Sequence, residues 1–338
     1  MNVSSKRALL QILKVAVSLG LIIFLLSRIP PGRLMAVIVE AKPLELLLAV
    51  ALFFLSGLLG SYQWHLLLRA GGISLPFPKT FRLYFIGLFF NNFLPANVGG
   101  DAVKIYHVSR IGNDPHQVFA ITLLDRIIGI TGLCLLAVAA SVILKGGGHI
   151  QNLNIYILIF LGCIAPVVAL TLNRRLSGAV KRLFGMITWW GLGGRFHAVF
   201  EHLGNFRKLR FLLVKLTLLA VAVQFMRVLT HVTVGGSLGL DLSWETASSF
   251  FVFIPLLGLL MVLPISINGL GLREGMGVVL FTQIGLLEEQ ALLVEFITYV
   301  IMVVVSLVGG IFFLRRHLTG ERIPAGGRDQ GDGLSKLL

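Results

Sequence analysis

Charged residues are scarce in this sequence of 338 residues, where they make up 13% of the chain, against about 25% in ordinary soluble domains. Apolar residues make up 56%, above the roughly 45–50% of a soluble domain. Such a surplus is accommodated only if lipid replaces water around much of the surface. The shortage of charge therefore excludes a soluble enzyme and predicts an all-α integral membrane protein with several spans.

Cysteine and catalytic signatures are also nearly absent. The two cysteines, Cys134 and Cys163, both lie inside apolar runs, which favours small packing residues over a disulfide framework or a metal site. No Gly-x-Ser-x-Gly, His-Glu-x-x-His or Walker loop occurs in the sequence. We therefore expect no enzyme activity, no catalytic residue, no metal and no cofactor, and the chain cannot by itself be an ATP-driven pump.

Acidic residues are fewer than basic residues. The sequence has 15 Asp and Glu against 29 Lys and Arg, which gives a net charge of +14. In a soluble protein this balance would indicate nucleic acid as a partner. Here the basic residues lie mainly between apolar runs, where they set membrane orientation or contact anionic lipid. Nucleic acid is therefore not an expected partner.

Six apolar runs are long enough to cross a membrane, since a spanning helix needs roughly 20 apolar residues. They cover residues 8–27, 44–68, 117–144, 153–172, 211–235 and 290–314. The first run follows Lys6 and Arg7, exceeds the length of a signal-peptide core and lacks a small-residue cleavage site. We expect it to be a retained helix.

Two further apolar stretches are interrupted by proline and glycine. Stretch 79–111 contains Leu-Pro-Ala-Asn-Val-Gly-Gly-Asp at 94–101, and stretch 244–287 contains Leu-Pro-Ile-Ser-Ile-Asn-Gly-Leu-Gly at 263–271. Proline and glycine break helices. Broken backbone at membrane depth is tolerated only inside protein or against a watery cavity.

Basic residues fix the direction of the chain, because loops rich in Lys and Arg stay in the cytoplasm. The strongly basic loop 173–210, both termini and the loop near residue 75 are expected to be cytoplasmic. Counting spans between these anchors, stretch 79–111 must begin and end inside, and stretch 244–287 must begin and end outside. Each is therefore predicted to be a re-entrant helical hairpin, and the two enter from opposite faces.

The order span, hairpin, span recurs with reversed orientation in units of about 44–144 and 211–314. Inverted repeats with discontinuous helices at mid-depth are a recurring transporter design, although glycine and proline are also common in membrane helices generally. We predict one transmembrane domain over residues 1–318 and a disordered cytoplasmic tail over 319–338.

Candidate substrate-binding residues lie at the two breaks and among the charges inside the membrane. Helix N-termini that follow the glycines present free N–H groups to an anion, and charges inside the bilayer usually face a cavity or each other. Glu295 is expected close to the outer surface, and His107 and His231 are interpreted as polar packing residues. The candidates are Asn97, Gly99, Gly100, Asp101, Lys104, Asp125, Arg126, Arg227, Asn268, Gly269, Gly271, Arg273 and Glu274.

The segment from Asn91 to Asp101, the later Asp125-Arg126 and the Gly-Leu-Arg-Glu-Gly end of segment 263–275 resemble the flippase-like membrane domain of lysylphosphatidylglycerol synthases. The resemblance covers about residues 8–316. It implies movement of a phospholipid between leaflets. In the full-length synthases a separate soluble domain attaches an amino acid, and here only a short tail follows Arg316, so we expect the translocating part alone.

The leading hypothesis is a lipid flippase or transporter of the cell inner membrane that moves a lipid with an anionic or polar head group through a mid-depth site between the hairpins. Its expected partners are membrane lipids with anionic or amine-bearing head groups, and self-association is left open. Two alternatives also remain open. One is an integral-membrane enzyme that acts on a lipid-linked substrate, and the other is a membrane scaffold without transport.

Overall fold

A computed structural model of the protein describes residues 41–92, 99–144, 150, 153–172, 209–262 and 271–318. The helices are α3 (Pro43–Ala70), α4 (Phe77–Asn91), α5 (Gly99–Ser109), α6 (Pro115–Leu144), α7 (Leu153–Leu172), α10 (Arg210–Ser237), α11 (Trp244–Leu260), α12 (Leu272–Phe281) and α13 (Glu288–Leu318), with a short 3₁₀ turn η3 (Thr282–Ile284) before α13.

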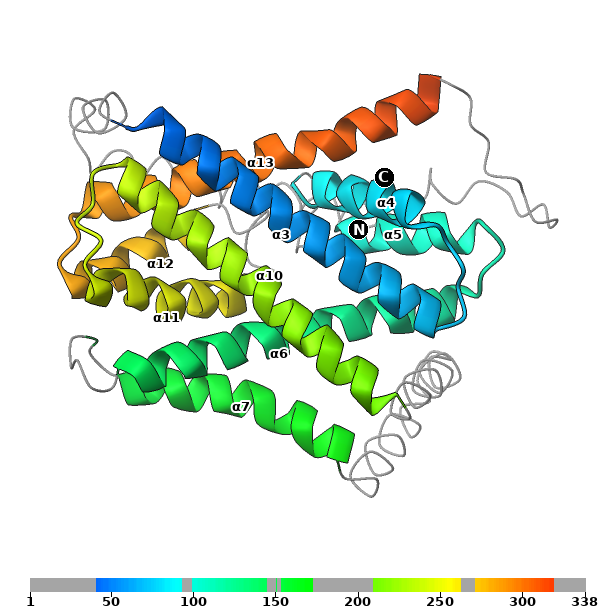
Figure 1. Ribbon diagram of the computed structural model, residues 1–338, viewed down its shortest axis with the longest axis horizontal. Helices are drawn as coiled ribbons and strands as arrows, with labels where there is room; N and C mark the ends of the chain where they lie inside the picture. Colours follow the sequence, from blue (N-terminus) through cyan, green and yellow to red (C-terminus); the bar gives the residue numbers. More distant parts are fainter. Residues whose placement is uncertain are drawn as a thin grey trace, which may run out of the picture.

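Helices α3 and α10 run side by side and antiparallel through the centre of the bundle (Figure 1). The backbone N–H of Lys42, just before α3, donates to the carbonyl of Ser237 at the end of α10 over 2.9 Å. Helix α13 lies on one side of this pair, and α6 with α7 lies on the other (Figure 1). The chain is thus a helical bundle around a central antiparallel pair.

Four of the predicted spans are confirmed as helices long and apolar enough to cross a membrane. These are α3, α6, α10 and α13, which match the expected runs 44–68, 117–144, 211–235 and 290–314. The expected run 153–172 coincides with α7, and its crossing of the membrane stays a prediction. The expected helix 8–27, the tail 319–338 and nearly all of the basic loop lie outside the described residues.

Local sequence accounts for several helix ends. Pro43 stands in the first turn of α3, where a missing N–H costs no hydrogen bond. Gly72 follows that helix with a φ of +83°, a conformation that glycine adopts without steric cost. Ser243 caps α11, because its Oγ accepts from the backbone N–H of Thr246 over 3.2 Å.

Both interrupted stretches consist of two short helices. Stretch 79–111 forms α4 and α5, and stretch 244–287 forms α11 and α12 with η3. The two pairs lie toward opposite ends of the bundle (Figure 1). Helix α4 packs against α13 of the other predicted unit, and α11 packs against α6 in the same way. Each predicted unit therefore supplies a long helix to the short pair of the other.

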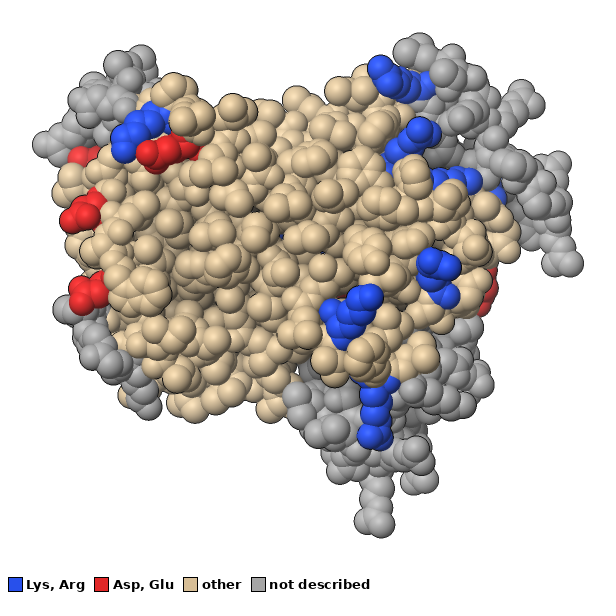
Figure 2. All heavy atoms as spheres, in the orientation of Figure 1, with Lys and Arg blue, Asp and Glu red and all other residues tan. Residues whose placement is uncertain are grey.

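Charge is separated between the two ends of the bundle. Most described basic side chains gather at the end where α3 terminates and α10 begins, and most acidic ones gather at the opposite end (Figure 2). Arg69, Lys79, Arg82, Arg110 and Arg210 belong to the basic end, and Glu45, Asp241, Glu245, Glu288 and Glu289 belong to the acidic end. This separation is the one that the predicted orientation requires.

Glycines permit the closest helix contacts. A Cβ at Gly309 of α13 would overlap the carbonyl oxygen of Phe85 in α4. A Cβ at Gly132 of α6 would lie 2.7 Å from the Cβ of Ala220 in α10. Small residues that allow backbones to approach are a common basis of helix association in membranes.

Gly309→Ala is therefore expected to lower the free energy of unfolding by about 1–3 kcal/mol, because backbone atoms must move apart to admit the methyl group. Gly162→Ala in α7 is the matched control, since a Cβ there meets nothing within 4 Å. Thermal unfolding in detergent checks both variants. Equal melting temperatures for the two would contradict the close contact between α4 and α13.

Candidate functional site

A first charged cluster joins α5 to α6 and consists of Asp101, Lys104, Asp125, Arg126 and the amide of Gln63. Asp101 forms ion pairs with Lys104, at 2.8 Å between Oδ1 and Nζ, and with Arg126. The Gln63 side chain of α3 donates its Nε2 to Asp125 Oδ1 over 2.8 Å. The cluster thus ties three helices together.

Lys104 is also enclosed by aromatic rings. Its Nζ lies 5.0 Å from the ring centre of Trp64 and 5.1 Å from that of Tyr84, within the range of cation–π attraction. Asp101 and Lys104 are 7% and 6% exposed. Their opposite charges compensate each other in a place where an isolated charge would be costly.

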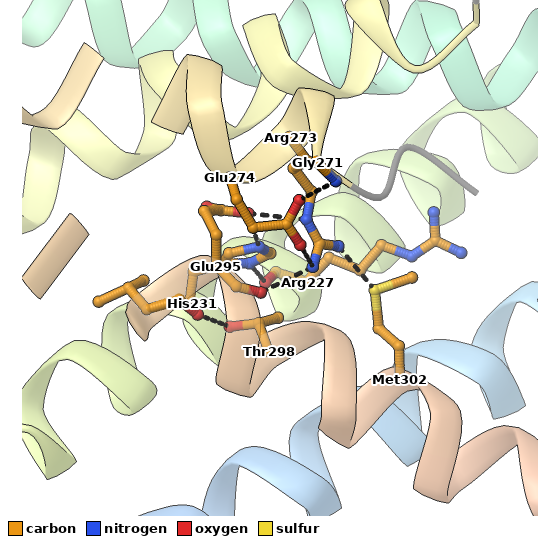
Figure 3. A network of polar contacts seen from close by, with 9 residues as sticks. Arg227, His231, Gly271, Arg273, Glu274, Glu295, Thr298 and Met302 are labelled. Carbon is orange, nitrogen blue, oxygen red and sulfur yellow. Dashed lines mark hydrogen bonds and ion pairs between the residues drawn. The ribbon is translucent and has the colours of Figure 1, made fainter. Parts of the chain in front are cut away.

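A second charged cluster joins α10, α12 and α13 and consists of His231, Arg273, Glu274 and Glu295 (Figure 3). Arg273 Nε lies 2.9 Å from Glu295 Oε2, and Arg273 Nη2 donates to the Glu295 carbonyl over 2.7 Å. Glu274 accepts from the backbone N–H of Gly271 over 2.6 Å and so caps α12. Glu295 is fully buried.

His231 connects this cluster to the neighbouring turn of α10. Its Nδ1 lies 2.9 Å from the carbonyl oxygen of Arg227, so this nitrogen carries the proton and donates. Its Nε2 then faces Glu295 Oε2 at 3.7 Å. Arg227 itself extends its guanidinium group away from the second cluster (Figure 3).

One cavity of about 370 Å³ reaches both charged clusters, a size within the range of small-molecule sites. Residues of α3, α4, α5, α6, α10, α11, α12 and α13 line it. The acidic, basic and histidine side chains that line it are Asp101, Lys104, Asp125, Arg126, Arg227, His231, Arg273 and Glu295. Its walls are otherwise largely apolar, with Leu88, Ile130, Leu133, Ile254 and Leu257 among them.

The cavity brings together six of the predicted site residues, namely Asp101, Lys104, Asp125, Arg126, Arg227 and Arg273. Glu274 lies behind Arg273, with 3.9 Å between its Oε1 and Arg273 Nη2. Gly271 precedes α12 with a φ of +80°, and its N–H is already bonded to Glu274. Asn97, Asn268 and Gly269 lie outside the described residues.

Gly99 and Gly100 begin α5, as expected for glycines at the break. The N–H of Gly100 donates to Asn91 Oδ1 over 2.7 Å. A Cβ at Gly100 would overlap the carbonyl oxygen of Gly87 in α4. The described geometry therefore gives Gly100 a role in close packing of α4 against α5, and its N–H already has a partner.

Glu295 is fully buried where α10 and α12 pack against α13, and its expected depth close to the outer membrane surface stays a prediction. Gln63 is a second residue that sequence reasoning did not select, since an uncharged amide inside an apolar run gives little signal. The charge of Glu295 inside the run 290–314 was the available signal for its role. Within the described segments, no three His, Cys, Asp or Glu side chains are grouped to hold a metal ion.

Residues 11–310 match the family model described as the lysylphosphatidylglycerol synthase TM region. The chain belongs to this family. The family accounts for a multi-pass membrane protein with several apolar helices, and its model covers both charged clusters. No solved structure matches the chain.

The similar curated proteins are archaeal and carry the name UPF0104 membrane protein. PH1989 of Pyrococcus horikoshii is 25% identical over 194 residues, which are 56% of each chain. A protein of Methanothermobacter thermautotrophicus is 24% identical over 278 residues, which are 76% of this chain and 80% of the relative. The chain spans about half the length of the first relative and a third of MJ1595 from Methanocaldococcus jannaschii.

Proposed function

We propose that this protein is a lipid flippase or transporter that passes the head group of a membrane lipid through the cavity between α4–α5 and α11–α12, while the acyl chains stay in the bilayer. The observation that carries this proposal is the cavity itself. It combines apolar walls with two clusters of ion-paired side chains and the side chain of Arg227. A lipid with a charged head and an apolar body requires such a mixture.

Helix length supports two re-entrant hairpins. Helices α4 and α5 have 15 and 11 residues, or about 22 and 16 Å at 1.5 Å per residue, and both fall short of the roughly 30 Å hydrocarbon core. Helix α12 has 10 residues and is shorter still. The placement of the two pairs at oppositely charged ends of the bundle supports their entry from opposite faces (Figures 1 and 2).

The contacts between the two predicted units support an inverted repeat, because the short helices of each unit pack against a long helix of the other. Matching α3 with α10, α4 with α11, α5 with α12 and α6 with α13 turns the α4–α13 contact into the α11–α6 contact. The central α3–α10 contact maps onto itself. This is the pattern of contacts that a pseudo-two-fold axis produces, and transporters of this design bind substrate at the repeat interface.

Transport is tested in proteoliposomes that contain traces of acyl-labelled fluorescent phospholipids, with dithionite quenching of the outer leaflet. The wild-type protein is expected to expose inner-leaflet label that protein-free vesicles retain. Arg227→Gln is expected to slow exposure about 10–100-fold, as for loss of a charge-assisted hydrogen bond to phosphate.

Arg69→Gln is the matched control, because Arg69 is an exposed arginine at the end of α3 and does not line the cavity. Its rate is expected to equal the wild-type rate. An unchanged rate in Arg227→Gln would remove this side chain from the site. Retention of every labelled lipid by wild-type vesicles would overturn the proposed function.

A further inference from the structure

Two charged side chains that line the cavity take part in no ion pair within the described part of the chain, and they have opposite signs. Asp125 and Arg227 are both half-buried and both face the cavity. The other charged lining residues are paired, as Asp101 is with Lys104 and Arg126, and Arg273 is with Glu295. The cavity therefore offers one anionic and one cationic group.

The cationic group without an ion pair among the described residues is Arg227, in the middle of α10. The Nε of Arg227 is buried and has no hydrogen-bond partner among the described residues. Its guanidinium extends away from Glu295, toward which His231 turns (Figure 3). A guanidinium group suits the paired oxygens of a phosphodiester.

The anionic group is Asp125 of α6, and the side chain of Gln63 holds it from one side. Gln63 donates to Asp125 Oδ1 over 2.8 Å and fixes the carboxylate without neutralising it. A carboxylate held by a neutral amide remains able to accept from a ligand ammonium group. The neighbouring Arg126 is bound to Asp101 instead.

We infer that the cavity selects a zwitterionic lipid head group, in which a phosphodiester contacts Arg227 and a primary ammonium contacts Asp125. This inference rests on the proposed function and names its substrate class, that of phosphatidylethanolamine. A purely anionic head group would leave the Asp125 carboxylate without an ion-pair partner in this partly enclosed cavity. A purely cationic head group would do the same to Arg227.

The test compares three acyl-labelled lipids in wild-type proteoliposomes: phosphatidylethanolamine, its N-acetylated form and phosphatidylglycerol. Acetylation converts the ammonium into a neutral amide and leaves the phosphodiester intact. We expect phosphatidylethanolamine to cross about tenfold faster than either anionic lipid, as for one charge-assisted hydrogen bond. Equal rates for all three would overturn the inference and leave the proposed function standing. Movement of none of them would overturn both.

Asp125→Asn assigns the selectivity to one side chain. It is expected to reduce the ratio of the phosphatidylethanolamine rate to the N-acetyl rate to about one, as the loss of that single bond requires. A ratio of rates does not depend on the amount of folded protein in the vesicles. Retention of the wild-type ratio in Asp125→Asn would overturn the role of Asp125.

The same polar chemistry also occurs in free phosphoethanolamine, so uptake of the radiolabelled compound into proteoliposomes forms the second arm. We expect no uptake above that of protein-free vesicles, because the apolar cavity walls favour a ligand with attached acyl chains. Uptake of the free compound at the rate of the lipid would overturn the assignment to a lipid.

Discussion

Arg273→Met is expected to lower the free energy of unfolding by about 3–5 kcal/mol, because it leaves a buried carboxylate without its counter-ion. Arg273 is paired with Glu295, which is fully buried, and also donates to the Glu295 carbonyl. Methionine keeps most of the side-chain volume, so the loss reports charge and hydrogen bonding rather than a cavity. Unfolding of the purified protein by dodecyl sulfate in mixed micelles measures the change.

The double variant Arg273→Met/Glu295→Gln separates the ion pair from general damage. Removing both charges is expected to restore at least half of the lost stability, because the isolated buried charge causes most of it. Glu274 stays near the altered position, with 3.9 Å between its carboxylate and Arg273, so full recovery is not expected. Wild-type stability in the single variant would show that Glu295 does not depend on Arg273.

Asp101→Asn is expected to cost about 3 kcal/mol, because Lys104 and Arg126 lose their shared counter-ion. Lys104 is 6% exposed, so water solvates little of its charge. The Trp64 and Tyr84 rings near its ammonium group offset part of the loss. The same detergent unfolding experiment measures the effect.

Asp241→Asn is the matched control, because Asp241 is an exposed aspartate in the connection between α10 and α11. Its effect is expected to stay within about 0.5 kcal/mol. A second comparison is Asp101→Asn/Lys104→Met, which is expected to be more stable than Asp101→Asn alone. If the double variant were less stable, the loss in Asp101→Asn could not be ascribed to the uncompensated lysine.

The features predicted from the sequence were those set by local composition. Apolar length located α3, α6, α10 and α13, and proline–glycine clusters located the interruptions between the short helices. The Asp101–Lys104 ion pair could also be predicted from the sequence, because residues three apart share a helix face. In each case the residues that make the prediction are the same residues that form the helix, the helix end or the ion pair, or lie next to them in the sequence.

The remaining contacts depend on how distant helices meet. Gln63 and Asp125 are 62 residues apart, and only the packing of α3 beside α6 brings their side chains together. Glu295 stands near the start of a long apolar run, so its position alone suggested the membrane surface. Burial by α10 and α12 could not be read from one helix. Gly309 likewise gave no local sign that it contacts the backbone of α4.

Each short helix pair packs against a long helix of the other predicted unit, and this affects folding during synthesis. Asn92 at the end of α4 donates to Ser306 of α13 over 2.6 Å, and 214 residues separate them. When α4 leaves the ribosome, the helix that will cover it has therefore not yet been translated. The α4–α5 pair must therefore wait without its α13 partner. Completion of the N-terminal half is thus delayed until the last helix inserts, and a chain that stops before α13 lacks a finished first half as well as a second.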